Sequence, residues 1–371
     1  MITGEYSPMQ GGVGAFTRIL SGEMAAQGHE LFILSRVGTE SEQPGVYLTD
    51  AVQRWGIGSL ISARRWADEE QLDVVNLQYQ TAAFGMSPFI HFLPEALRPI
   101  PVVTTFHDLR FPYLFPKAGR LRDGIVVRLA NASNGVIPTN HEDFARLKHP
   151  CATLIPIGSN IVQTPNDAQV WREKAGAAAD DFLIVYFGLV NRSKGLDTLL
   201  EAVATLRDLP VRLALVGAVA GSSDSTNAAY MREIDALIER LELAARIHRA
   251  GFLDDAAVSG YLLAADVVAL PFTDGASYRR GTLMAALQHG CAIVTTTPQV
   301  AIPAFVDGEN MRLMPPNDVK ELADALRQLQ AEPEIRASLR RGAMELSKQF
   351  DWREIARSTL NFYRRVVGAR A

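Results

Sequence analysis

Two consecutive arginines at the start of a helix pattern carry the clearest chemical signal in the sequence. Arg279 and Arg280 follow a strand-like run and directly precede Gly281 and Thr282, where a short helix pattern begins. A helix start presents unpaired backbone N–H groups and the positive end of the helix dipole. Guanidinium groups bind phosphate oxygens in pairs. The segment therefore predicts a phosphate or diphosphate site; the alternative is a solvated loop whose charges balance nearby acids.

A second cationic loop, residues 187–195, joins a strand pattern to a helix pattern. It contains Arg192 and Lys194. In an open α/β sheet such a loop lies at the carboxyl edge of the strands, where these sheets bind ligands. A lysine there can meet a phosphate as a mobile point charge. The alternative is an ordinary loop before a helix, with solvated cations.

Glycines in front of the first helix pattern predict a ligand loop in the N-terminal part. Gly11, Gly12 and Gly14 let the backbone approach a ligand closely, and the helix start favours an anion, although a tight turn would need the same residues. Thr17 stands where a dinucleotide-binding fingerprint has its third glycine. Because Arg36 follows the second strand pattern and could meet a 2′-phosphate, an NADP-dependent oxidoreductase stays as an alternative.

His107 and Asp108 end another strand pattern. A histidine at that edge can bind a substrate hydroxyl or move a proton near neutral pH, and Asp108 could orient the ring or cap a turn. A lone histidine can equally be structural. The next segment, residues 109–128, mixes aromatic and basic side chains. It predicts either docking on an anionic membrane surface or an acceptor-side loop followed by an amphipathic helix.

Composition limits the class of protein. A chain of 371 residues with 48% hydrophobic residues is long enough for two domains with sizeable cores. A net charge of −4 and a pI near 6.0 argue against a nucleic-acid partner. Two cysteines do not suggest a disulfide scaffold, and the sequence contains no Asp-x-Asp pair that would hold a metal. No membrane span or signal peptide is visible, so a cytoplasmic protein is expected.

Strand and helix patterns alternate nearly throughout, which predicts two α/β units with parallel sheets. We expect an N-terminal domain over residues 1–164, a second domain over 165–350 and a closing helix over 351–371. The first strand is nearly missing before Gly4. Either the true start lies upstream or this strand is unusually short. The other predicted strands cover 31–34, 74–77, 102–106, 135–138, 182–187, 213–216, 267–271 and 291–295.

The order and spacing of these segments resemble the GT-B glycosyltransferases, specifically the large retaining group 4 family. His107 falls where that family has its central histidine, close to the transferred sugar. Lys194 matches the lysine that contacts the donor diphosphate. The resemblance covers nearly the whole chain and includes residues 11–14, 28–30, 155–158, 264–271, 290–295, 307–310 and 350–352.

The resemblance implies two Rossmann-like domains whose parallel sheets face a central cleft, with a C-terminal helix that crosses back to the first domain. It implies a nucleotide-diphosphate sugar held by the second domain and an acceptor held by the first, near Gly11, Gly12 and Asp108. It further implies metal-independent transfer with retention of the anomeric configuration. No cofactor besides the donor is expected, and the oligomeric state is not predicted.

The chain departs from the family pattern in the donor loop. The two glutamates usual there fall on Ser277 and Ala285, and an alanine cannot hold a donor ribose. Leu189 stands where the family has an arginine, for which Arg192 could substitute, and Ala304 stands where a third acid is frequent. The protein is then either a transferase that grips its donor mainly through phosphate, a non-catalytic nucleotide-sugar or glycan-binding relative, or a GT-B epimerase. The donor-binding set predicted for a transferase is Arg192, Lys194, Ser277, Arg279, Arg280, Gly281 and Thr282.

Overall fold

A computed structural model describes residues 1–9, 11–109, 119–217 and 225–369. The chain divides into two compact units. The N-terminal unit consists of Met1–Asn160 together with Phe350–Ala371, and the C-terminal unit of Ile161–Gln349. The domain boundaries expected after residues 164 and 350 lie close to this division. The expectation of two α/β units, each with its own sheet, is confirmed.

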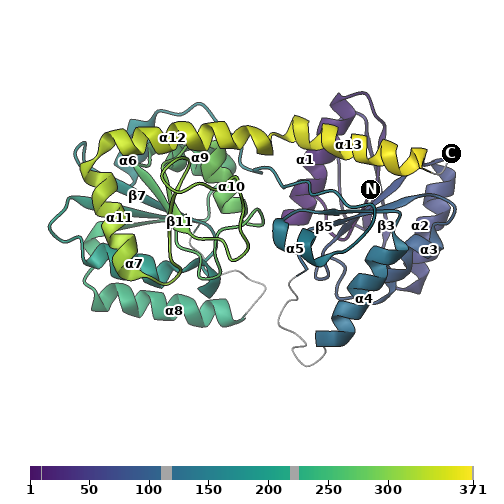
Figure 1. Cartoon of the computed structure of the whole chain (residues 1–371), viewed down its shortest axis with the longest axis horizontal. Helices are drawn as coiled ribbons and strands as arrows, with labels where there is room; N and C mark the ends of the chain where they lie inside the picture. Colours follow the sequence, from purple (N-terminus) through teal and green to yellow (C-terminus); the bar gives the residue numbers. More distant parts are fainter. Residues whose placement is uncertain (10, 110–118, 218–224, 370–371) are drawn as a thin grey trace. The chain divides into compact units, whose positions relative to one another are not determined.

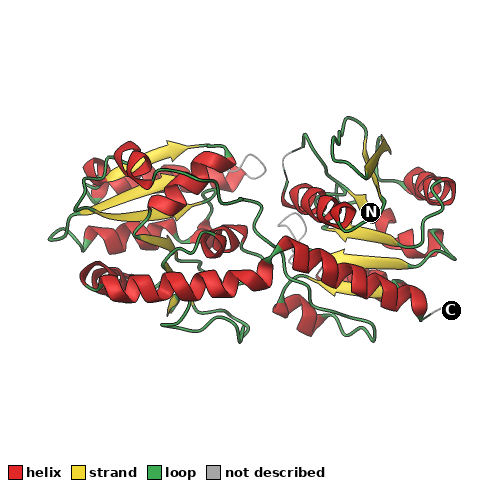
Figure 2. Ribbon diagram, turned by 90° about the horizontal axis from the view of Figure 1, so that it is seen from above, coloured by secondary structure: helices red, strands yellow, loops and turns green. Residues whose placement is uncertain are grey.

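The N-terminal unit is built on a six-stranded parallel sheet in the order β3-β2-β1-β4-β5-β6. Helices lie on both faces of this sheet (Figures 1 and 2). Its strands are β1 (Ile2–Thr3), β2 (Leu31–Arg36), β3 (Val46–Val52), β4 (Val75–Tyr79), β5 (Val102–Phe106) and β6 (Gly135–Pro138). Its helices are α1 (Gly12–Ala26), α2 (Ile57–Glu69), η1 (Phe89–Phe92), α3 (Leu93–Ala96), α4 (Gly119–Ala132), α5 (His141–Arg146) and α13 (Trp352–Gly368).

The C-terminal unit repeats this plan with the sheet order β12-β11-β10-β7-β8-β9. Its strands are β7 (Phe182–Phe187), β8 (Val211–Val216), β9 (Ile247–Gly251), β10 (Val267–Leu270), β11 (Ile293–Thr296) and β12 (Arg312–Met314). Its helices are α6 (Ala168–Lys174), η3 (Arg192–Lys194), α7 (Leu196–Ala204), α8 (Ser225–Arg240), η4 (Ala244–Arg246), α9 (Asp255–Ala264), α10 (Gly281–Gln288), α11 (Val319–Ala331) and α12 (Pro333–Ser347), and η5 (Lys348–Phe350) lies at the boundary of the units.

The strand order reverses direction at one place in each sheet. In the N-terminal unit this place lies between β1 and β4, and in the C-terminal unit between β7 and β10. Open α/β sheets bind ligands outside the carboxyl ends of the strands at such a reversal. The loops that follow β7 and β10 contain Lys194 and the Arg279–Arg280 pair. The topology therefore brings together two cationic loops that lie far apart in sequence.

Three strands that the sequence did not reveal, β3, β9 and β12, all lie at sheet edges. A central strand such as β5 is buried along its whole length and therefore reads as a continuous apolar run. β3 exposes or half-exposes most of its residues, and β9 has no fully buried residue. An edge strand needs no continuous apolar run, so its sequence signal is weak.

Helix α13 belongs to the N-terminal unit, which confirms the expectation of a closing helix that crosses back. It packs beside α1 (Figure 1). Its side chains Phe362 and Val366 are buried against β6. A Cβ atom on Gly135 would lie 2.8 Å from each of them, so only glycine allows the helix to approach this strand so closely.

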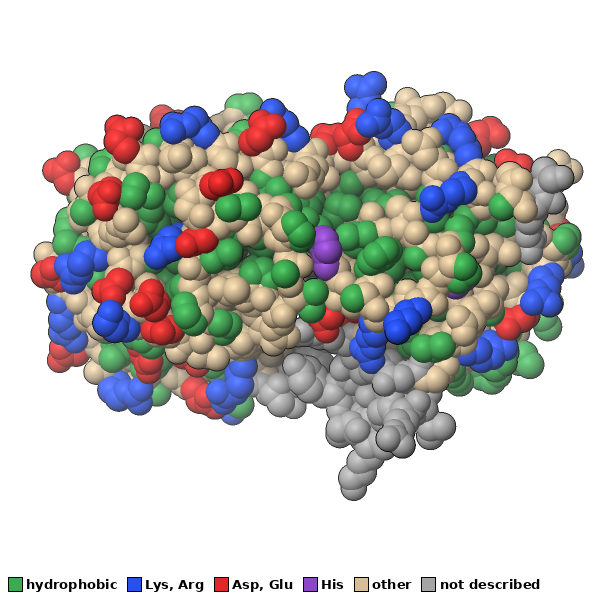
Figure 3. Space-filling model, in the orientation of Figure 1, with side chains coloured by type: hydrophobic (Ala, Val, Ile, Leu, Met, Phe, Trp, Pro, Cys, Tyr) green, Lys and Arg blue, Asp and Glu red, His purple; other side chains and the backbone are tan. Residues whose placement is uncertain are grey.

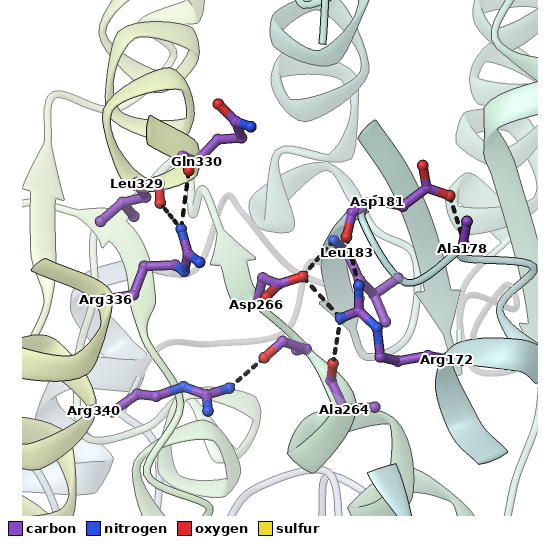
Figure 4. Close-up of polar contacts among 11 residues, drawn as sticks. Arg172, Ala178, Asp181, Leu183, Ala264, Asp266, Leu329, Gln330, Arg336 and Arg340 are labelled. Carbon is purple, nitrogen blue, oxygen red and sulfur yellow. Dashed lines mark hydrogen bonds and ion pairs between the residues drawn. The ribbon is translucent and has the colours of Figure 1, made fainter. Parts of the chain in front are cut away.

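Helix α6, which precedes the C-terminal sheet, is bonded to the amino ends of two strands. Arg172 of α6 forms an ion pair of 2.9 Å with Asp266 and donates to the carbonyl oxygen of Ala264 (Figure 4). Asp266 also accepts from the backbone N–H of Leu183. Because this network lies at the amino edge of β7 and β10, it stabilises the sheet at the end opposite the cationic loops.

A buried histidine connects the start of the C-terminal unit to α10. The backbone N–H of Thr164 donates to Ser259 Oγ at 2.9 Å, and Ser259 Oγ lies 2.9 Å from His289 Nε2. His289 Nδ1 lies 2.7 Å from the carbonyl oxygen of Ala285, which can only accept. Nδ1 therefore carries the proton, and Nε2 accepts from the serine hydroxyl. Burial is the main cause that lowers the pKa of His289 below its ordinary 6.5.

We expect this contact to make the protein less stable in acid. Because the folded-state pKa of His289 is lowered, its contribution to stability is present above pH 6.5 and is lost as the pH falls below that value. Urea unfolding at pH 8 and pH 5 measures the effect. His289→Gln should reduce the pH dependence of the unfolding free energy between these two pH values. An unchanged pH dependence in this variant would contradict the assignment.

Candidate active site

Lys194 lies at the carboxyl end of β7 in a position that two glycines create. Its ammonium group occupies the space where a side chain on Gly188 would be, and Gly188 has a φ of +124°. Gly195, with a φ of +63°, brings the loop so close to the carbonyl oxygen of Pro271 that a Cβ atom would collide with it. L-residues rarely adopt either backbone conformation. The loop after β7 is thereby held against the end of β10.

The charge of Lys194 is destabilised in the ligand-free protein. Burial, and secondly the positive charge of Arg280, lower the pKa of Lys194 to about 8. Among the residues that the structure describes, none accepts a hydrogen bond from its ammonium group. An anion bound beside it would favour the charged form and raise this pKa. The site is therefore suited to a negatively charged ligand.

Arg280 joins the two cationic loops. It forms an ion pair with Asp274 of its own loop, in which the two side chains are only 17% and 25% exposed. It also donates to Ser193 Oγ of the neighbouring loop at 3.3 Å, and its guanidinium lies 4.5 Å from the centre of the Phe272 ring. These contacts fix the guanidinium directly before the first turn of α10. Asp274, which the sequence did not mark as functional, orients it.

The start of α10 leaves polar groups unsatisfied. Arg280 is the N-cap residue, and no side chain caps the helix. Thr282 Oγ1 is buried and has no hydrogen-bond partner within the described residues. A Cβ atom on Gly188 would lie 2.8 Å from the Thr282 methyl group, which places this threonine next to the Lys194 ammonium. The start of α10 thus lies next to the Lys194 ammonium group, and a helix start beside a cation is suited to an anion.

The remaining predicted donor residues differ in their surroundings. Ser277 and Arg279 are partly buried in the same loop as Arg280, and Gly281 opens the helix. Arg192 is 66% exposed and binds both carboxylate oxygens of Glu233 on α8, each at 2.6 Å. To reach a phosphate, Arg192 would have to leave this ion pair. Its contacts therefore do not support the predicted role in donor binding.

His107 follows β5 in the N-terminal unit and is held in one orientation. Its Nε2 atom lies 2.8 Å from Gln78 Oε1, and the ring meets the Phe16 ring edge-on at 4.6 Å. Its backbone N–H donates to the carbonyl oxygen of Tyr79. Burial lowers the pKa of His107 to about 3. The imidazole is therefore neutral at physiological pH.

The helix start behind the glycine loop is already occupied by an acidic side chain of the protein. Glu5 Oε1 accepts from the backbone N–H groups of Val13 and Gly14 at 3.1 and 3.4 Å. A Cβ atom on Gly11 would collide with this carboxylate, whereas Gly12 faces open space. The interpretation of this helix start as an anion site for a ligand therefore needs correction, because Glu5 fills that role. A carboxylate from outside the first turn matches no capping pattern, so this contact could not be predicted from the sequence.

Part of the predicted membrane segment, residues 110–118, lies outside the described residues, and Asp108 before it is partly buried. Within α4, Val126 is buried and Val127 is exposed. Arg128 pairs with Glu95 at 2.6 Å and lies over the Phe92 ring, so its charge is already compensated. Within the described ranges, no helix is long and apolar enough to cross a membrane.

The face of the molecule drawn in Figure 3 has no single basic patch over the described residues of the C-terminal unit. On the face drawn in Figure 3, acidic and basic side chains are interspersed over the C-terminal unit, at the left. Nucleic-acid binding surfaces instead gather lysine and arginine on one side. Among the described residues, there is also no cluster of three or more His, Cys, Asp or Glu that could hold a metal ion.

Comparison with known proteins identifies the family. Residues 10–152 match the family model described as Glycosyltransferase Family 4, and residues 181–332 match the model described as Glycosyl transferases group 1. The chain belongs to glycosyltransferase family 4. It is a glycosyltransferase of the hexosyltransferase type with the GT-B fold, as the resemblance predicted. This membership favours the transferase prediction over the oxidoreductase, the epimerase and the non-catalytic relative.

Curated relatives and solved structures agree with this assignment. A D-inositol 3-phosphate glycosyltransferase from Saccharomonospora viridis is 32% identical over 55% of this chain and 48% of the relative. A phosphatidyl-myo-inositol mannosyltransferase from Mycolicibacterium smegmatis is 24% identical over 97% of this chain and 91% of the relative. HepE from Anabaena, solved with UDP and glucose, shares the fold with a TM-score of 0.76 and 21% identity, covering 96% of this chain and 97% of that chain.

Proposed function

We propose that this glycosyltransferase moves a sugar from a nucleotide-diphosphate sugar to an acceptor hydroxyl, with retention of configuration and without a metal ion. The observation that carries the proposal is the convergence of Lys194, Arg280 and the uncapped start of α10 at the strand-order reversal of the C-terminal unit. This arrangement supplies fixed positive charge where a diphosphate leaving group develops negative charge.

Lys194 is the main ligand for the leaving diphosphate. Its ammonium group is paired with no carboxylate among the described residues, and a bound anion would offset the burial that lowers its pKa. Arg280 adds a second charge, although Asp274 neutralises part of it. Thr282 Oγ1 and the backbone N–H groups of α10 complete the hydrogen bonds to the phosphate oxygens. These groups do what a metal ion does in other transferases.

Binding through the phosphates also explains why the donor loop can lack the usual glutamates. Ala285 is fully buried in α10, so no carboxylate is available there for a ribose hydroxyl. The site instead presents cations and hydroxyl groups. We therefore infer that the diphosphate contributes more to donor affinity than the ribose does, so nucleoside diphosphates should bind far more tightly than the corresponding nucleosides.

In the transfer step the acceptor oxygen forms a bond to the anomeric carbon while the bond from that carbon to the diphosphate oxygen breaks. The incoming hydroxyl approaches on the face from which the diphosphate leaves, and its proton passes to a diphosphate oxygen. No oxidant, reductant or covalent enzyme intermediate is needed. His107 binds a hydroxyl group of the sugar or of the acceptor through hydrogen bonding.

The acceptor panel should begin with inositol compounds. The curated relatives are named for D-inositol 3-phosphate and phosphatidyl-myo-inositol. We propose a cytoplasmic enzyme that acts on a hydroxylated acceptor, free or in a lipid headgroup, with peripheral membrane contact through residues 109–128. Sedimentation with anionic and neutral vesicles tests the membrane contact, and transfer to a free inositol compound or to its lipid form separates the two acceptor sources.

Metal independence gives a direct test. We expect transfer from UDP-, GDP- or ADP-sugars to be unchanged in excess EDTA, because the cations that stabilise the leaving group are side chains. A thermal-shift screen with sugar nucleotides and bare nucleotides identifies the base first, and product NMR then reports the anomeric configuration. Loss of transfer with EDTA and recovery with Mg²⁺ or Mn²⁺ would refute metal independence, and an inverted product would refute retention.

A further inference from the structure

A row of buried polar side chains leads from the interior of the N-terminal sheet to His107. Asn76 and Gln78 of β4 and Thr105 of β5 are at most 2% exposed, on the face that packs against α1 and α13. Strands of a covered parallel sheet normally carry apolar residues at such positions. Burying three polar side chains costs free energy unless each finds a partner, and these three bond to one another and to His107.

A backbone carbonyl fixes the orientation of every amide in the row. Asn76 Nδ2 lies 3.4 Å from the carbonyl oxygen of Val103 and 3.0 Å from Thr105 Oγ1. Because a carbonyl can only accept, the nitrogen of the Asn76 amide must face it, and Oδ1 faces the other way. Gln78 Nε2 donates to this Asn76 Oδ1 and also lies 3.9 Å from Met1 Sδ.

The orientation of the Gln78 amide also determines which nitrogen of His107 carries the proton. Since Gln78 turns its nitrogen towards Asn76, its Oε1 atom is the one that lies 2.8 Å from His107 Nε2. An amide oxygen can only accept, so Nε2 must carry the proton. In a neutral imidazole the other nitrogen is then an acceptor. The ring contacts Phe16 of α1 and Gln78 of β4, both of which are uncharged.

We propose that Gln78 is a positioning residue that locks His107 as the Nε2–H tautomer, so that Nδ1 accepts a hydrogen bond from a hydroxyl of the sugar or the acceptor. This inference rests on the proposed function of His107 and refines it. His107 then selects a hydroxyl donor and does not act as a general acid. Analogues in which that hydroxyl is replaced by fluorine or hydrogen lose this contact.

The wild-type protein tests the tautomer without any assay of activity. Long-range ¹H–¹⁵N correlation spectra of protein with ¹⁵N-labelled histidine distinguish Nε2–H from Nδ1–H imidazole, and His107→Phe assigns the signal. We expect the Nε2–H pattern, unchanged between pH 8 and pH 5. An Nδ1–H pattern, or titration to imidazolium in that range, overturns the proposal. Absence of transfer with every donor would refute the proposed function but leave this spectrum valid.

Variants of Gln78 test whether the tautomer of His107 affects kcat. Gln78→Met removes the acceptor, and we expect mixed tautomers of His107 and a kcat about tenfold lower, the effect of one neutral hydrogen bond, with little change in the KM for the donor. Gln78→Glu restores an acceptor at the same atom and should restore the Nε2–H signal. Gln43→Met, a partly buried glutamine of the same unit that contacts Tyr6, is the matched control. An unaltered His107 spectrum in folded Gln78→Met would overturn the proposal.

Discussion

Replacing Lys194 by methionine should lower kcat/KM by about 10²- to 10³-fold, the loss typical for one preorganised oxyanion donor. Methionine keeps the length of the side chain and removes the charge that neutralises the departing diphosphate. The fold should be unaffected or slightly more stable, because burial destabilises this charge in the ligand-free protein, as the lowered pKa of Lys194, about 8, indicates. Steady-state kinetics and urea unfolding measure the two effects separately.

Lys174→Met is the matched control for this change. Lys174 belongs to α6 of the same unit and lies over the Trp171 ring, 3.7 Å from its centre. We expect full activity from it. Wild-type donor affinity should also weaken as the pH rises above about 8, since Lys194 must be charged to bind the diphosphate. Normal turnover of Lys194→Met would refute the assignment of the donor site.

Gly188→Ala should abolish most activity although the new methyl group is small. A Cβ atom at this position would overlap the Lys194 ammonium and lie 2.8 Å from Thr282, so the lysine must leave its place beside α10. The φ of +124° adds backbone strain of roughly 1–2 kcal/mol for an L-residue. We expect a loss of kcat/KM of about the size seen for Lys194→Met.

Gly308→Ala separates the effect of backbone strain from the effect of displacing Lys194. Gly308 also has a positive φ, +76°, but a Cβ atom there would meet nothing within 4 Å. Both variants should lose comparable stability in urea unfolding, and only Gly188→Ala should lose activity. Equal activity in the two variants would show that the position of Lys194 beside Gly188 is not needed for transfer.

The sequence by itself determined most of the fold. Buried strands such as 102–106 and 182–187 are continuous apolar runs because both faces of the sheets are covered by helices. The helix start at Gly281–Thr282 was predictable because charge, glycine and apolar spacing change together there. Edge strand β3 could not be predicted, because most of its residues are exposed or half-exposed and need not be apolar.

Only the tertiary structure decided which charged groups act together. Arg192 and Lys194 are two positions apart in sequence, yet the first pairs with Glu233 on α8 and the second lies half-buried beside α10. Glu5 at the start of α1 and Gln78 beside His107 gave no local signal, because each acts on a residue far along the chain. The spacing of apolar residues along the chain shows which face of a helix or strand is buried. A binding site depends instead on which loops the strand order brings to the same edge of the sheet.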